Sequence, residues 1–156
     1  MIKNDEFFMK QAFKEAKKAF EKGEVPIGCV IVDNKTKEIL ARAHNLKEQK
    51  EDVTAHAEIL AIKKASKKIG NWRLSDTTLY VTVEPCVMCA GAIIQSRIRN
   101  VYYGAKDYKG GALGSSINVL EAKNINHHLN VKGGILEEEC SLIISNYFKQ
   151  KRKKEN

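Results

Sequence analysis

The chain has 156 residues, which suits one globular domain, since single domains usually contain about 100–150 residues and bury most of their apolar surface at this size. Its composition is 43% hydrophobic and 29% charged, and no apolar run approaches the roughly 18 residues that a membrane-spanning helix needs. The amino-terminal segment mixes charges into its apolar pattern, which is unlike a secretory signal. We therefore expect one domain over residues 1–156, located in the cytoplasm.

The net charge of +8 favours a polyanionic partner. The positive charge is concentrated in two stretches, "KKASKKIGNWR" with five basic and no acidic residues, and "FKQKRKKEN" with five basic residues and one acidic. Taken alone, lysine-rich stretches more often form a solvated face or tail than a binding site. The charge pattern therefore supports a nucleic-acid partner only in combination with a catalytic motif.

In chain order, the first predicted element is an amphipathic helix over residues 4–22, with Asn4 as its N-cap and Gly23 at its end. Two short strands at 27–32 and 38–44 follow, and the turn sequence "DNKTK" joins them. The pair is typical of a β-hairpin.

The later elements alternate between helix and strand. In order, they are a helix at 54–68, a strand at 78–84, a helix at 86–96, a strand at 100–105, a Gly-rich loop, a short strand at 130–135, and a basic helix with its tail from about residue 137. We expect the helix at 54–68 to bury Ile59, Ile62, Ala65 and Ile69, and the last helix to bury Cys140, Ile143, Ile144 and Tyr147. This alternation indicates an α/β fold, a three-layer α/β/α sandwich with a mixed central sheet of about five strands.

The stretch "EPCVMCAGAII" holds two of the four cysteines, directly after a proline. A redox Cys-x-x-Cys normally follows the first strand of a small βαβ unit, whereas this pair follows three predicted strands. Cys29 and Cys140 lie alone in apolar periodic segments and are assigned to the core. Cys86 and Cys89 are therefore either half of a metal site or small core residues, and a metal site requires another donor.

The upstream stretch "TAHAEIL" supplies that donor. Residues three apart share a helix face, so Cys86 and Cys89 can bind one ion, and a helix N-terminus lowers a thiol pKa toward the thiolate that zinc prefers. Pro85 suits the first helical position. If the two helix starts face each other, His56 joins the cysteines around one Zn²⁺, and the fourth tetrahedral position stays open, as in catalytic sites.

Glu58 lies two residues after His56, in a first helical turn from which both side chains can reach a point beyond the helix end. A carboxylate beside a zinc site can take a proton from water and deliver it elsewhere. His-x-Glu followed by Pro-Cys-x-x-Cys is the known signature of zinc-dependent nucleobase deaminases. Both motifs, in this order and each at a helix start, favour a hydrolytic deaminase over coincidence.

Longer stretches carry a closer resemblance, among them "EVPIGCVIV", "TAHAEILAI" and "NWRLSDTTLYVTVEPCVMCAGAIIQSRIRNVYYGAKDYKGGALGS". Together with "AHN", "NHH" and "GGILEEEC", they resemble the bacterial tRNA-specific adenosine deaminases over residues 24–140. The resemblance implies a cytidine-deaminase-like fold, a homodimer, one Zn²⁺ per subunit, and conversion of adenosine to inosine at the wobble position of a tRNA anticodon.

The resemblance also implies roles for the residues of the two motifs. It makes His56, Cys86 and Cys89 the zinc ligands. It makes Glu58 the group that takes a proton from water, donates a proton to ring N1 of adenine, and finally passes a second proton to the departing ammonia.

Three further residues are matched through the resemblance alone. Asn45 corresponds to a residue that hydrogen-bonds the flipped base, Ile27 to an apolar residue lining the pocket, and Asp107 to a contact with the substrate backbone. The basic carboxyl-terminal helix and tail would then hold the tRNA anticodon stem-loop. Without the resemblance, Asn45 and Asp107 are typical turn residues and Ile27 is a core residue.

Two other functions remain open. The same zinc chemistry could act on a free base or nucleoside, as in guanine or cytidine deaminases, although the basic tail and the stretch "KDYKGGALGS" weigh against this. A zinc-stabilised RNA-binding module would need a fourth protein ligand and would leave Glu58 without a role.

Overall fold

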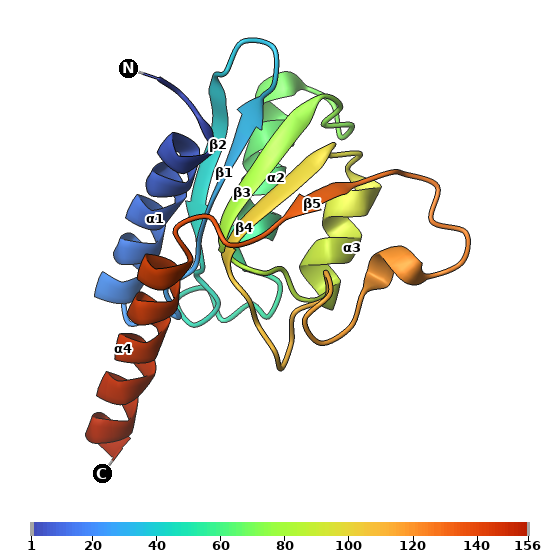
Figure 1. The fold of residues 1–156 in the computed structure, drawn as a ribbon. Helices are drawn as coiled ribbons and strands as arrows, with labels where there is room; N and C mark the ends of the chain where they lie inside the picture. Colours follow the sequence, from blue (N-terminus) through green and yellow to red (C-terminus); the bar gives the residue numbers. More distant parts are fainter. Residues whose placement is uncertain (1, 156) are drawn as a thin grey trace.

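The computed structural model describes residues 2–155 and has an α/β architecture built on one five-stranded sheet (Figure 1). The strands are β1 (Gly28–Asp33), β2 (Ile39–His44), β3 (Thr77–Val83), β4 (Asn100–Ala105) and β5 (Asn130–Lys132), and their order in the sheet is β2-β1-β3-β4-β5. β1 is antiparallel to both of its neighbours, whereas β3, β4 and β5 are mutually parallel. The mixed sheet of five strands is therefore confirmed.

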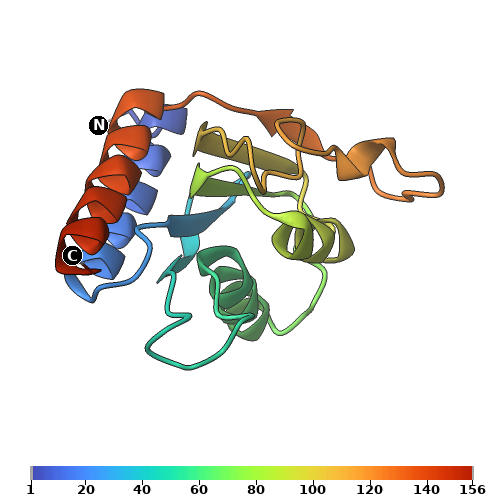
Figure 2. The same cartoon turned by 90° about the horizontal axis from the view of Figure 1, so that it is seen from below.

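Four α-helices cover the two faces of this sheet. They are α1 (Asp5–Glu21), α2 (Ala57–Ile69), α3 (Val87–Gln95) and α4 (Glu137–Glu155), and a short 3₁₀ helix, η1 (Val119–Glu121), lies between β4 and β5. α1 and α4 pack on one face, and α2 and α3 on the other, which gives the three predicted layers (Figure 2). Among residues 2–155, no helix is both long enough and apolar enough to cross a membrane.

The start of α1 and its close packing on β1 both follow from single residues. The Asn4 side chain accepts a hydrogen bond from the Phe7 N–H at 2.9 Å, so the predicted N-cap is confirmed. Gly28 lies so close to the backbone of α1 that a Cβ atom there would overlap the Ala12 carbonyl oxygen. Glycine therefore allows α1 to lie directly on the sheet.

The core has two main parts, one on each side of the sheet, and β1 contributes to both. Cys29 and Ile31 face the cluster that α2 and α3 cover, whereas Val30 and Val32 face the cluster beneath α1. This alternation is the period of two that a strand imposes on its side chains. Since all four residues are buried, the sheet is covered on both faces.

The predicted buried stripe of α2 is wrong in phase. Ala57, Ala61 and Ala65 are fully buried, whereas Ile69 is 45% exposed. Small side chains on the inner face let α2 approach the sheet closely, whereas Ile59 and Ile62 are only partly buried, although Ile62 still packs against the core. Of the four residues predicted to be buried, only Ala65 belongs to the inner face.

α4 is also less buried than its sequence pattern predicts. Cys140 is its only buried residue, as the core assignment of this thiol requires, whereas the other three predicted residues, Ile143, Ile144 and Tyr147, are half-buried. The helix continues to Glu155 and carries its basic residues into solvent. One end of α4 thus packs on the sheet, and the other extends beyond the sheet and beyond the end of α1 (Figure 1).

Candidate active site

The residues predicted for the site lie along one edge of the sheet. β2, β3 and β4 run in the same direction and end at this edge, and the antiparallel β1 begins there. Asn45 directly follows β2, Cys86 follows β3, Asp107 follows β4, and Ile27 precedes β1. Loops at the carboxyl ends of strands are the usual place for ligand sites in open α/β sheets.

α2 and α3 both begin at this edge, and each starts with a residue of the metal motif. His56 is the N-cap of α2 and Cys86 is the N-cap of α3, but neither side chain makes a capping hydrogen bond. A capping hydrogen bond from a side chain stabilises a helix by about 0.5–2 kcal/mol, and α2 and α3 lack this contribution. The imidazole of His56 and the thiol of Cys86 therefore stay available to bind a metal ion. Pro85 precedes the N-cap, so its predicted place at the first helical position is wrong, because Cys86 is still extended.

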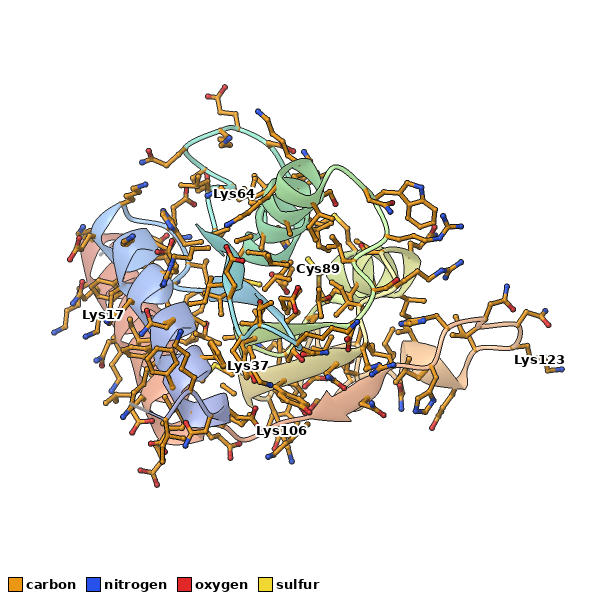
Figure 3. All side chains as sticks on the ribbon, turned by 90° about the horizontal axis from the view of Figure 1, so that it is seen from above. Lys17, Lys37, Lys64, Cys89, Lys106 and Lys123 are labelled. Atoms are coloured by element: carbon orange, nitrogen blue, oxygen red, sulfur yellow. The ribbon has the colours of Figure 1, made fainter. Side chains whose placement is uncertain are left out.

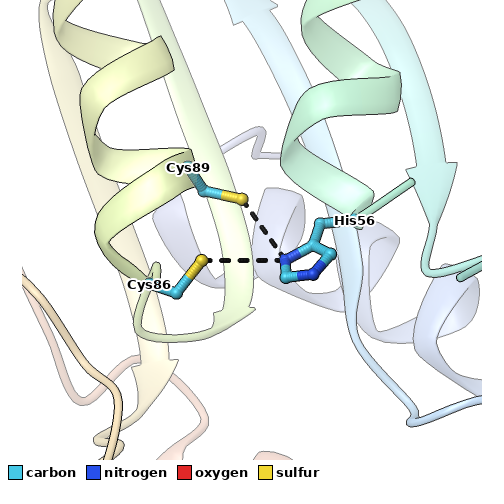
Figure 4. Close-up of side chains that lie close together, drawn as sticks. All are labelled: His56, Cys86 and Cys89. Carbon is cyan, nitrogen blue, oxygen red and sulfur yellow. Dashed lines mark hydrogen bonds between the residues drawn. The ribbon is translucent and has the colours of Figure 1, made fainter. Parts of the chain in front are cut away.

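Three donor atoms converge between the two helix starts (Figure 4). The Nδ1 atom of His56 lies 3.7 Å from the Cys86 sulfur and 3.5 Å from the Cys89 sulfur, and all three donor atoms lie within 4.8 Å of one another. Tetrahedral zinc, with Zn–S bonds of about 2.3 Å and Zn–N bonds of about 2.0–2.1 Å, separates nitrogen and sulfur by about 3.6 Å. The three side chains therefore fit one zinc ion.

The two thiols hold their protons very differently. A hydrogen bond from Cys89 lowers the pKa of Cys86 to about 4, against the opposing effect of burial, and His56 contributes a second hydrogen bond. The same interaction with Cys86, together with burial, raises the pKa of Cys89. One thiolate is thus already favoured, and this is the form that binds metal.

Glu58, in the first turn of α2, is 4% exposed. Burial is the main reason that its pKa is raised to about 7, and the negative charge of the nearby Cys86 adds to the effect. A carboxyl group with a pKa near neutrality can both accept and release a proton at ordinary pH. The arrangement thus places three potential metal donors in one group and a buried carboxyl group with a pKa near neutrality close to them.

Two of the residues matched through the resemblance hold turns of the backbone. The Asn45 side chain accepts a hydrogen bond from the Lys47 N–H at 3.0 Å and donates one to the Val25 carbonyl at 3.3 Å. Asp107 accepts bonds from the N–H groups of Lys109 and Gly110 at 3.1 and 3.0 Å. Both side chains are therefore fixed in place, and their contacts with substrate remain predictions.

A groove of about 990 Å³ connects this edge of the sheet with α4. Ile27 and Asp107 line one part of it, and the α4 residues Phe148, Lys149 and Arg152 line another. The three metal donors are not among its lining residues, and the buried Cys89 lies in the middle of the molecule, between Lys17 on one side and Lys123 on the other (Figure 3). The groove therefore leads along the surface beside the metal site.

Comparison with known proteins identifies the family. A model of MafB19-like deaminases matches residues 3–152. The tRNA-specific adenosine deaminase of Bacillus subtilis (strain 168) is 55% identical over 150 residues, which cover 96% of this chain and 92% of that protein. The chain belongs to the tRNA-specific adenosine deaminase family.

Solved structures give the same grouping. A tRNA:A34 deaminase, studied for A-to-I editing at the wobble position of transfer RNA, is 45% identical to this deaminase, with a TM-score of 0.83 over 87% of this chain and 97% of the other. A guanine deaminase from Bacillus subtilis is 33% identical, with a TM-score of 0.62 over 77% of this chain and 86% of the other. In sequence and structure, this deaminase is more similar to the tRNA:A34 deaminase.

Two buried carboxylates of the deaminase, neither of them predicted from the sequence, hold the loops around the site. Glu24 accepts hydrogen bonds from the N–H groups of Glu48 and Gln49 at 3.0 and 2.7 Å, in the loop before α2. Glu84 does the same for the loop after β4. The only signal in the sequence was the position of each carboxylate at the end of an apolar strand or helix.

A third buried carboxylate lies elsewhere in the deaminase, on α1. Glu15 accepts hydrogen bonds from Lys18 at 2.7 Å and from His44 at 2.9 Å. Burial raises the pKa of Glu15, but the bonds from Lys18 and His44 outweigh it and hold the pKa below its ordinary value. His44, which had no predicted role, thus ties β2 to α1.

The metal assignment predicts the behaviour of two cysteine variants. Cys89→Ala removes one of three donors, so the purified protein should contain far less than the about one zinc ion per chain expected of the unaltered protein. Cys140→Ala, at a buried thiol of α4, is the matched control and should keep its zinc. Metal content is measured by mass spectrometry, and equal zinc in both variants would contradict the assignment.

Proposed function

We propose that the protein is a zinc-dependent hydrolase that converts adenosine to inosine at the wobble position of a tRNA anticodon, with residues 1–156 acting as one catalytic domain. The supporting observation is the convergence of His56, Cys86 and Cys89 beside the buried Glu58, in a chain 55% identical to a tRNA-specific adenosine deaminase. The reaction adds the oxygen of water to C6 of adenine, breaks the bond from C6 to its amino nitrogen, and releases ammonia.

In this proposal, His56, Cys86 and Cys89 hold one Zn²⁺ per subunit. When bound there, zinc supplies a Lewis acid that makes water a nucleophile near neutral pH. The partial positive charge at the starts of α2 and α3 favours the thiolate forms of the two cysteines. Among residues 2–155, the potential metal donors that converge within 4.8 Å are these three side chains, and three protein ligands with one position for water are the pattern of a catalytic zinc site.

Glu58 moves the protons of the reaction. Its carboxyl group accepts a proton from the attacking water and donates it to ring N1 of the base. It then takes the second proton from the new hydroxyl group on C6 and donates it to the departing amine. The pKa near 7, caused mainly by burial, suits both directions of transfer. The same burial limits competition from bulk water.

Asn45 and Ile27 hold the base, and Asp107 contacts the backbone beside it. The backbone N–H of Asn45 donates to the Ile27 carbonyl at 3.1 Å, so these two residues keep a fixed relation to each other. To reach the site, the adenine must leave its stack. This step costs less in a single-stranded anticodon loop than in a duplex.

The groove beside the site suits the nucleotides that flank the target. Its lining combines cationic side chains, which attract phosphates, with aromatic rings on which bases can stack. The lining cations are Lys106, Lys109, Lys149 and Arg152, and the lining aromatic residues are Tyr108 and Phe148. The net charge of +8 acts in the same direction. The family resemblance implies a homodimer that acts on tRNA, and we propose that it works in the cytoplasm and that the RNA follows this groove.

Glu58→Gln tests the proposed function directly. The amide keeps the size of the side chain but cannot carry a proton, so inosine formation should fall by at least about 100-fold while zinc content and RNA binding are retained. The product is measured by sequencing a tRNA with adenosine at the wobble position, where inosine is read as G.

Unaltered, zinc-loaded protein that leaves this adenosine unchanged would contradict the proposal, and free guanine and cytidine would then be tested as substrates. If the unaltered protein is active and Glu58→Gln is equally active, the proton-transfer role of Glu58 is wrong.

A second prediction concerns the groove. Replacing Lys149 and Arg152 together with alanine should weaken binding of an anticodon stem-loop several-fold and reduce the slope of log affinity against log salt by about 1–2. Lys35→Ala, in the turn at the opposite edge of the sheet, is the control and should leave the slope unchanged. Fluorescence anisotropy at several salt concentrations measures both effects. An unchanged slope in the double variant would exclude the groove as the path of the RNA backbone.

A further inference from the structure

Glu84 is a buried carboxylate that belongs neither to the metal donors nor to the lining of the groove. It directly follows β3, is 3% exposed, and stands two residues before Cys86. Its Oε1 atom accepts a hydrogen bond from the Asp107 N–H at 3.2 Å, and its Oε2 atom accepts bonds from the N–H groups of Leu113 and Ser115 at 3.0 and 3.1 Å. One side chain thus binds both ends of the loop at 107–115.

The surrounding backbone reinforces this anchor. The Ala112 N–H donates to the Pro85 carbonyl at 2.9 Å, and the Glu84 N–H donates to the Ala105 carbonyl at 2.9 Å. Gly111 packs so closely on the carboxylate that a Cβ atom there would lie 2.5 Å from its carboxyl carbon. The loop therefore closes around Glu84 and its neighbour Pro85, which lead directly into the metal motif.

The hydrogen-bond partners of Glu84 argue against two simpler roles, that of a metal ligand and that of a general support of the core. All three hydrogen bonds to its side chain come from backbone N–H groups of a single loop, so the carboxylate has no need of a metal ion. Glu84 is also not a general support of the core, because the hydrogen bonds of its side chain hold only the loop at 107–115. This loop carries Asp107 and part of the groove wall. Its position therefore links the loop to the strand end that presents Cys86.

We propose that Glu84 is a positioning residue that fixes the loop at 107–115 relative to the metal site, so that Asp107 and the groove wall meet the RNA in one preset arrangement. The inference rests on the proposed function for the identity of the substrate. Without Glu84, the three backbone N–H groups of the loop lose the carboxylate to which they all donate. The loop is then less ordered in the free protein, and RNA binding has to order it. Loss of the anchor should therefore weaken substrate binding more than it slows the chemical step.

Glu84→Gln tests this role because glutamine keeps the shape of the side chain but replaces one acceptor oxygen with an NH₂ group that faces a backbone N–H. We expect KM for an anticodon stem-loop to rise about tenfold, kcat to change less than about threefold, and zinc content to stay unchanged. Hydrogen exchange of the amides at 107–115 should become at least about tenfold faster. Gly111→Ala, which pushes a Cβ atom against the same carboxylate, should show the same pattern.

Glu15→Gln is the matched control, since it neutralises a buried carboxylate that contacts neither this loop nor the metal motif. It should lower the melting temperature but leave KM and the exchange of the loop unchanged. Slow exchange of 107–115 in Glu84→Gln, an unchanged KM, or loss of zinc would each overturn the proposal, as would an equal rise of KM in Glu15→Gln. If the unaltered protein forms no inosine, the proposed function fails, and the exchange experiment still decides whether Glu84 anchors the loop.

Discussion

The structure of the site depends on one constraint, that α2 and α3 both begin at the same edge of the sheet. α3 connects the parallel strands β3 and β4, and α2 leads from β2 to β3, so both helix N-termini point toward the edge where these strands end. Free N–H groups and partial positive charge collect at such an end. His56, Cys86 and Cys89 can therefore meet around one point, and the positive helix ends favour the thiolates. The loops that carry Asn45 and Asp107 leave the same edge, which brings the rest of the site to it.

This arrangement has costs that the surrounding structure offsets. The two N-cap positions lack capping side chains, and several carboxylates are buried. Glu24 and Glu84 are accommodated because backbone N–H groups of neighbouring loops donate to them. Among residues 2–155, no buried side-chain nitrogen or oxygen lacks a hydrogen-bond partner. The buried carboxylates of Glu24 and Glu84 thus fix the irregular loops around the site by accepting hydrogen bonds from their backbone N–H groups.

The sequence predicts the elements and the metal motif well because these depend on local spacing. The strand β4 matches its predicted range of 100–105, and the α1 cap at Asn4 follows from the residue that begins the helix. His56, Cys86 and Cys89 are brought together because each stands at or beside a helix start. Local spacing does not predict the roles of Asn45, Ile27 and Asp107 in substrate binding. These roles rest on the family resemblance, and the proposed experiments test them.

Features that depend on tertiary contacts were not predictable. The inner face of α2 is set by alanines that allow close approach to the sheet, so a search for large apolar residues selects the wrong stripe. The bonds of Glu84 join residues that are 23 to 31 positions apart and leave no periodic pattern. The hydrogen bond between Glu15 and His44 joins residues that are 29 positions apart. Such contacts become visible only when the strand order is known.

The most direct test of the account is an X-ray absorption spectrum at the zinc edge of the purified protein. Two helix ends that supply one imidazole and two thiolates predict two sulfur ligands at about 2.3 Å and two nitrogen or oxygen ligands at about 2.0–2.1 Å. A bound ion with three or four sulfur ligands would show that another cysteine closes the site, and a protein that binds no zinc would show that the convergence of His56, Cys86 and Cys89 is not a metal centre. Either result would contradict the account.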